Sequence, residues 1–127
     1  NALITRHVPQ MFPKLRWGFI EATSAWMPFM ISHLLAASQR QGWDGKFDIK
    51  KDLLRANNFF VTCQTQDDIS HIVGLVGEDN LMLGTDYTHA DGAAEIEALG
   101  ILGKREDLSE TLRRKILDDN PRAFYAV

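Results

Sequence analysis

A short segment around residue 86 gathers the side chains of this sequence that are best suited to acid–base chemistry or metal binding. Residues 84–92 read GTDYTHADG, which places Asp86, His89 and Asp91 within six positions of one another. The segment begins in an apolar run, and a carboxylate at the end of a buried strand can bind a divalent cation or take a proton from water. From position alone, Asp86 could equally cap a turn or a helix, and His89 and Asp91 could be ordinary loop residues.

Two other polar side chains stand at the ends of apolar runs. Glu21 follows the run at residues 15–20, where an unpaired carboxylate would be buried against a sheet. For Glu21, both an ion pair with Arg or Lys and a catalytic role remain open. Cys63 ends the run at residues 59–63, but no histidine follows at a spacing typical of a thiolate pair, so we expect a packed core thiol. As the only cysteine, it favours a reducing, cytoplasmic compartment.

The elements that would position these residues form a repeated pattern. Apolar runs at residues 15–20, 59–63 and 81–86 are each followed by a helical pattern. This order predicts successive βα units and a parallel sheet buried on both faces. Because ligands bind beyond the carboxyl ends of the strands in such folds, the residues that end each run are the candidates for a site.

The helical patterns set further expectations. Apolar residues three and four positions apart predict a helix from near Ser24 to before Gly42, with Phe29 among the residues of its apolar face. The first half of the chain further predicts a turn at residues 43–46, a short helix that stops at residues 57–58, and a helix at residues 67–73 with an acidic first turn and Gly77 as its end. The second half predicts a helix that begins at residues 94–99, a helix at residues 109–117 with Leu108, Leu112 and Ile116 on one face, and a helical turn at residues 120–125.

The composition limits the class of protein. The 127 residues are 45% hydrophobic and 24% charged, with a net charge of -3, as in an ordinary soluble domain. We expect no nucleic-acid partner, because an excess of basic residues is missing. We also expect no membrane partner, because every apolar stretch is shorter than the roughly 18 residues that a membrane span needs, and residues 1–7 lack a signal-peptide core.

Six segments, in their order along the chain, resemble the carboxyl-terminal half of the amidohydrolase-related family. Its members are metal-dependent hydrolases and decarboxylases built on a distorted (β/α)8 TIM barrel. The segments are FPKLR at residues 12–16, similar to the start of strand six; FIEA at 19–22 and WMP at 26–28, similar to the end of strand six and the next helix; FFVTCQ at 59–64, similar to strand seven; GTDYTH at 84–89, similar to the strand-eight motif; and ILDDNPRAFY at 116–125, similar to the closing helix.

The resemblance implies an α/β fold in which residues 1–127 are the carboxyl-terminal part, about strands six to eight, of a single barrel domain. It implies that Asp86 is a metal ligand and catalytic proton acceptor, with His89 and Glu21 near the substrate. The implied cofactor is a divalent metal, zinc, with manganese or iron as alternatives. The sequence departs from the family pattern at Thr88, where a proline is common, and at Glu21, where many members carry a histidine ligand, although one branch carries Glu-Ala.

The function implied by the resemblance is hydrolysis of a C–O or C–N bond, or decarboxylation of a small carboxylic acid. The family's other histidine ligands would precede Asn1, and a barrel typically needs about 250 residues. We therefore expect this chain to be inactive by itself, with the rest of a barrel or a second copy as its partner. Two alternatives stay open, namely a non-catalytic α/β binding or interaction domain and a metal-free relative that serves as a binding scaffold.

Overall fold

The sheet consists of three parallel strands in a computed structural model that describes residues 2–41, 49–89 and 95–127. The strands are β1 (Trp17–Phe19), β2 (Phe59–Cys63) and β3 (Leu81–Leu83), and their order in the sheet is β1-β2-β3. Gly18 lies beside Phe60, and Thr62 lies beside Met82. The predicted parallel α/β arrangement is therefore confirmed. The predicted turn at residues 43–46 and the candidate Asp91 lie outside the described residues.

Burial differs between the strands. Every residue of β2 is buried, as expected for a strand rich in aromatic and β-branched residues that is covered on both faces. In β1, Gly18 is exposed, and Trp17 and Phe19 are only half-buried. The prediction of burial on both faces is therefore wrong for β1, because Phe19 of this strand lines an open apolar pocket instead of being fully covered.

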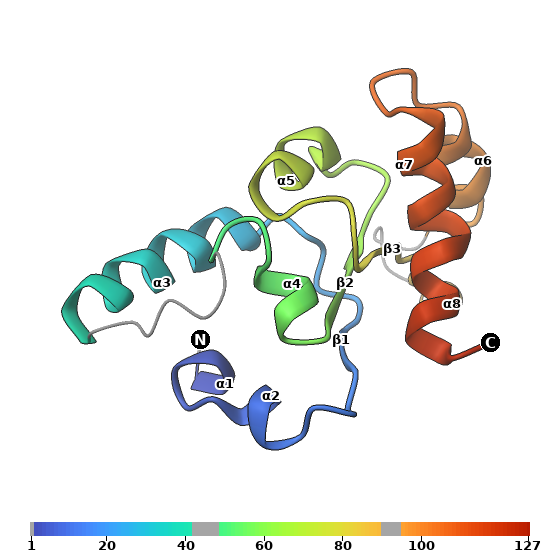
Figure 1. Cartoon of the computed structure of the whole chain (residues 1–127). Coiled ribbons are helices and arrows are strands. Elements are labelled where there is room, and N and C mark those ends of the chain that lie inside the picture. The colour runs from blue at the N-terminus through green and yellow to red at the C-terminus, as the bar shows by residue number, and fades with distance from the viewer. Residues whose placement is uncertain (1, 42–48, 90–94) are drawn as a thin grey trace.

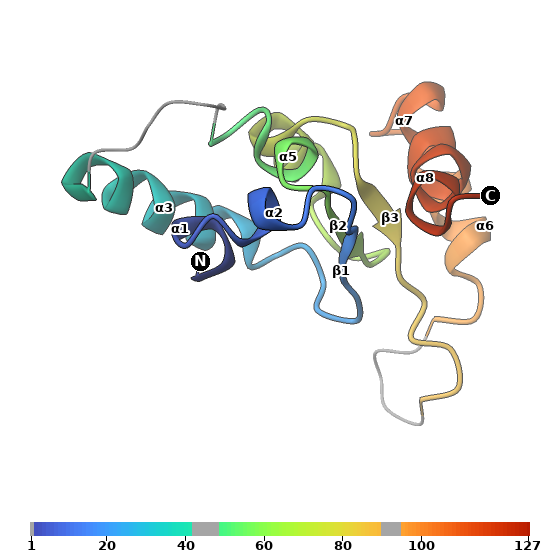
Figure 2. The same ribbon diagram turned by 60° about the horizontal axis from the view of Figure 1, so that its bottom comes forward.

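The helices surround this sheet unevenly. In two views, α6, α7 and α8 lie together beside β3, whereas α3 extends away on the opposite side of the sheet (Figure 1, Figure 2). The helical segments are α1 (Ala2–Thr5), α2 (Val8–Met11), α3 (Met27–Gln41), α4 (Leu53–Ala56), α5 (Ile69–Val76), α6 (Ala98–Gly103), α7 (Glu110–Arg114), the π-helical η1 (Lys115–Asp119) and α8 (Asn120–Tyr125).

Helix α3 buries most, but not all, of the apolar face predicted for it. Met27, Ile31 and Leu34 are its buried residues in the core, and Met30 packs against this core, whereas Phe29 is 76% exposed. The spacing of three and four therefore predicted the helix and much of its apolar face correctly but misplaced Phe29. The contact of α3 with α5 helps to set this orientation.

Short local signals account for the ends of α5 and the start of α7. The side chain of Asp68 accepts a hydrogen bond from the N–H of His71 and so caps α5, and Gly77, with φ of 84°, ends it. The acidic residues thus precede this helix instead of filling its first turn. Ser109 caps α7 in the same way. Leu108, Leu112 and Ile116 are all buried, as their spacing predicted.

The carboxyl-terminal helix is fixed against the sheet by one buried amide. Nδ2 of Asn120 donates hydrogen bonds to the carbonyl oxygens of Leu81 at 2.8 Å and Glu78 at 3.1 Å. Phe124 packs beside Phe60 with ring centroids 5.2 Å apart. These contacts place α8 beside β3 and leave the opposite ends of the strands, where the candidate residues lie, uncovered by this helix.

Candidate metal centre

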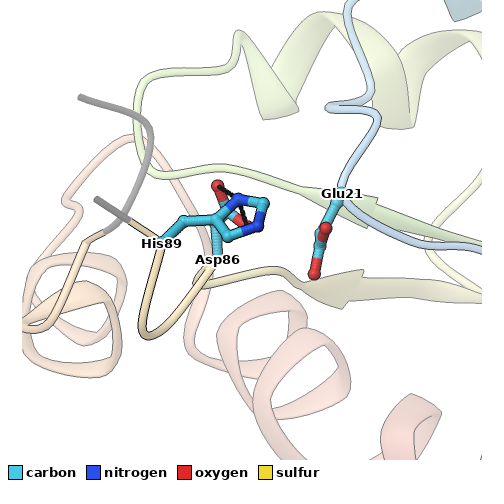
Figure 3. Close-up of side chains that lie close together, drawn as sticks. All are labelled: Glu21, Asp86 and His89. Carbon is cyan, nitrogen blue, oxygen red and sulfur yellow. Dashed lines mark hydrogen bonds and ion pairs between the residues drawn. The ribbon is translucent and has the colours of Figure 1, made fainter. Parts of the chain in front are cut away.

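Glu21, Asp86 and His89 lie together at the carboxyl ends of the strands. Glu21 comes two residues after β1, and Asp86 and His89 follow β3. One oxygen or nitrogen atom from each side chain lies within 4.8 Å of the other two (Figure 3). The three site residues chosen from the sequence are therefore neighbours, although they come from two separate loops.

The carboxylate of Asp86 is in contact with the imidazole of His89. Nδ1 of His89 lies 3.1 Å from one carboxylate oxygen and 3.2 Å from the other. The Asp86 side chain is 8% exposed and the His89 side chain 61% exposed. Among the described residues, the hydrogen-bond partner of this carboxylate is the imidazole and not a backbone N–H, so the geometry favours a site residue over a helix cap.

The backbone of the two site loops is strained. Glu21 and Thr23 after β1, and Asp86 and Thr88 after β3, all have φ between 49° and 79°. This left-handed region costs a residue other than glycine about 1–2 kcal/mol, and such residues gather at functional sites. The φ of 79° at Thr88 is also one that a proline ring forbids. The departure of Thr88 from the strand-eight motif therefore matches its local conformation.

Glu21 corrects one expectation. The sequence predicted that a charge at this position would be buried against the sheet, but Glu21 is exposed. The reason is that β1 ends at Phe19 and the chain has left the sheet by residue 21. No Lys or Arg among the described residues forms an ion pair with Glu21, and the ionisable groups that it meets are Asp86 and His89.

Cys63 takes no part in this site. Its side chain is fully buried, and its thiol donates a hydrogen bond to the carbonyl oxygen of Met82 at 3.2 Å. Burial, followed by the negative charge of Asp67, raises the pKa of the Cys63 thiol to about 12. A thiol with this pKa is a poor nucleophile at neutral pH. The prediction of a packed core thiol is confirmed.

Sequence reasoning missed the role of Asp67. This residue was assigned to the acidic first turn of a helix, but it lies before α5 and is buried. Its Oδ2 atom accepts hydrogen bonds from the hydroxyl and the N–H of Ser24, and from the N–H of Gln64. The sequence did contain a signal for this role. Two aspartates, Asp67 and Asp68, precede the helix, but a helix needs only one N-cap residue, so the other was available for a different contact.

An apolar pocket near the site is lined by a separate set of residues. A pocket of about 420 Å³ opens between α1, α3 and β1, with Phe19, Ala22 and Trp26 among its lining residues. Glu21, Asp86 and His89 are not among the residues that line it. The pocket therefore offers no apolar wall to the three polar side chains.

The donor set suits a divalent transition metal. Two carboxylates and an imidazole are ligands that zinc, manganese and iron accept. Donor atoms on one tetrahedral ion with bonds of about 2.0–2.2 Å lie roughly 3.3–3.6 Å apart, so donors within 4.8 Å of one another need to move closer by roughly 1 Å to share one ion. Nε2 of His89 remains available when Nδ1 donates its proton to Asp86. The residues present therefore fit a metal ion.

No helix in the described ranges has both the length and the apolar character needed to cross a membrane. This observation agrees with the sequence, in which polar residues interrupt every apolar stretch.

Comparison with known proteins gives a family. The family model described as "Amidohydrolase" matches residues 3–127. The structure is similar to the crystal structure of an amidohydrolase from Mycobacterium avium subsp. paratuberculosis K-10, with a TM-score of 0.80 and 26% sequence identity. The similarity covers 97% of this chain and 31% of the mycobacterial chain, so this chain spans about a third of its length. A search of curated proteins gave no significant match. The family match over nearly the whole chain shows that it belongs to the amidohydrolase family.

Proposed function

We propose that the protein containing this chain is a metal-dependent hydrolase or decarboxylase that acts on a small-molecule substrate. The observation that carries the proposal is the meeting of Glu21, Asp86 and His89 at the carboxyl ends of parallel strands, which is where α/β barrels carry their active sites. Family membership supports the same reading. The chain supplies about strands six to eight of the barrel in this proposal, and the rest of the barrel supplies further ligands.

Asp86 is assigned the central role. A divalent cation, zinc or else manganese or iron, would lower the pKa of a water molecule and polarise a carbonyl or carboxylate group. The carboxylate of Asp86 has two oxygen atoms, so that one can hold the cation and the other can accept a proton. Its low exposure of 8% strengthens both interactions, because fewer water molecules compete for the carboxylate.

His89 and Glu21 are assigned to the rim of the site. The contact between Nδ1 of His89 and Asp86 orients the imidazole and turns Nε2 outward, where it can meet a polar group of the substrate or the cation. Glu21 is exposed and can accept a hydrogen bond from a hydroxyl or amide group of the substrate. Both reactions, hydrolysis and decarboxylation, are compatible with these roles.

The test replaces Asp86 in the protein at its natural full length. D86N keeps the size of the side chain but removes its charge, so we expect bound metal to fall below one tenth of the wild-type content and turnover of a screened substrate to be lost. Metal content by plasma mass spectrometry and circular dichroism, which checks the fold, are the measurements. D52N is the matched control, because the side chain of Asp52 forms an exposed ion pair with Arg55 and is not part of the Glu21, Asp86 and His89 cluster.

A non-catalytic binding domain is the competing function. It predicts that the wild-type protein contains no stoichiometric metal and that D86N changes neither metal content nor the fold. That outcome would contradict the proposal. The loss of metal in D86N with normal content in D52N would support it.

A further inference from the structure

The hydroxyl of Thr62, in the middle of the sheet, makes two hydrogen bonds to the end of β1. Thr62 lies in the central strand β2 and is 3% exposed. Its Oγ1 atom accepts a hydrogen bond from the backbone N–H of Glu21 at 3.1 Å and donates one to the carbonyl oxygen of Phe19 at 3.3 Å. Both partners belong to the segment in which β1 ends and the chain turns toward the site.

These bonds explain how the chain leaves the sheet at this point. In a regular parallel sheet, backbone groups of β2 would continue to pair with the residues after Phe19. Here the side chain of Thr62 satisfies the N–H of Glu21 instead. The backbone of Glu21 is therefore free to take its left-handed conformation, with φ of 60°, and its carboxylate approaches Asp86 and His89.

Thr62 also meets the other half of the site. A Cβ atom added at Gly84 would lie 2.9 Å from Cβ and 3.1 Å from Oγ1 of Thr62, which is closer than side-chain atoms pack. The absence of a side chain at Gly84 lets Thr62 pack against the backbone just after β3, two residues before Asp86. One side chain thus contacts the segments that carry Glu21 and Asp86.

We infer that Thr62 is a positioning residue of the metal centre, whose hydroxyl holds the segment of Glu21 at a fixed distance from the segment of Asp86. Thr62 itself touches neither the cation nor the substrate in this proposal. It acts through the backbone of Glu21. The inference rests on the proposed function only in treating the three-residue cluster as a metal centre, since the hydrogen bonds of Thr62 exist without it.

The test compares T62V and T62S in the full-length protein. T62V keeps the branched shape, and so the contact with Gly84, but loses the hydroxyl, whereas T62S keeps the hydroxyl. S38A is the matched control, because Oγ of Ser38 also bonds a backbone carbonyl, that of Leu35, but within α3 and away from the site. The probes are Mn²⁺ alone, added to metal-free protein, and deuterium exchange of the Glu21 amide, followed in metal-free protein.

In T62V we expect Mn²⁺ to bind about tenfold more weakly, within the range known for residues that orient metal ligands, and the Glu21 amide to exchange about tenfold faster. T62S should restore both values, and S38A should change neither. Amide exchange at wild-type rate in T62V would overturn the inference, whether or not the protein binds metal. Mn²⁺ that binds to the wild-type protein and to T62V with equal affinity would also overturn it.

A wild-type protein that binds no Mn²⁺ would contradict the proposed function alone. In that case the amide-exchange result still decides whether Thr62 positions Glu21. The melting temperature separates both outcomes from general loss of structure. If T62V melts at the wild-type temperature, faster exchange at Glu21 reports the local loss of one hydrogen bond.

Discussion

Ser24 and Asp67 form a buried double contact, in which the hydroxyl and the backbone N–H of Ser24 both donate to Oδ2 of Asp67, at 2.8 and 2.7 Å. Ser24 lies in the loop after β1 and Asp67 in the loop after β2. The same oxygen accepts the N–H of Gln64 at 3.0 Å. One carboxylate therefore ties the loop that carries Glu21 to the loop of the central strand.

Removal of this carboxylate should destabilise the protein. D67A leaves three buried donors without an acceptor, and each unsatisfied buried group costs about 1–3 kcal/mol, so we expect a loss of roughly 3 kcal/mol or more in the free energy of unfolding. Urea unfolding followed by circular dichroism measures it. D67N, which keeps one oxygen acceptor, should lose less. An unchanged unfolding midpoint in D67A would contradict the assigned role.

The thiol of Cys63 should make stability depend on pH in alkaline solution. Its pKa is raised from an ordinary value of 9.0 to about 12 in the folded protein. Above pH 9 the unfolded chain loses the thiol proton while the folded chain keeps it, so the contribution is complete below pH 9 and falls as pH rises toward 12.

The C63A variant isolates this effect, because it lacks the titrating group but keeps all others. Between pH 8 and pH 10.5, the difference in free energy of unfolding between wild type and C63A should fall by about 2 kcal/mol, from the linkage between proton binding and stability. Urea unfolding at several pH values measures this difference. If the difference stays constant across the range, the thiol is not protected by folding.

His89 should contribute to metal affinity through its contact with Asp86. In the full-length protein, H89A removes the imidazole that lies 3.1 Å from the carboxylate, and we expect the Kd for Mn²⁺ to rise about 10- to 100-fold, as for other residues that orient a ligand. Isothermal titration calorimetry measures the Kd. H71A is the control, because His71 is an exposed residue of α5. Equal effects of the two variants would argue against a role for His89 at the site.

Local sequence patterns predicted much of the secondary structure. The run at residues 59–63 predicted β2 at its observed limits, because aromatic and β-branched residues favour a pleated, buried backbone. The spacing of Leu108, Leu112 and Ile116 predicted a buried helical face, since that spacing places side chains on one side of a helix. The short helices α1 and α2 gave no such periodic signal and were not predicted.

The site was predictable only in part. Asp86 and Glu21 could be chosen from the sequence because each follows an apolar run, and the family resemblance placed both of them, with His89, near a metal or substrate. The sequence could not show that Glu21 is exposed, because that depends on where β1 stops pairing with β2. It could not show that Thr62 bonds the backbone of Glu21 either, since a threonine in a buried strand is an ordinary β-former.

The sequence by itself thus determined where the three strands form, where most of the helices form, and which carboxylate follows β3. These features depend on side-chain shape and periodicity within a few residues. Only the tertiary structure decided that α3 turns Phe29 outward, that Asp67 joins two loops, and that Glu21 meets Asp86. These contacts join residues far apart in the chain, and they form because the buried strands pack in one register and the buried polar groups must each find a partner.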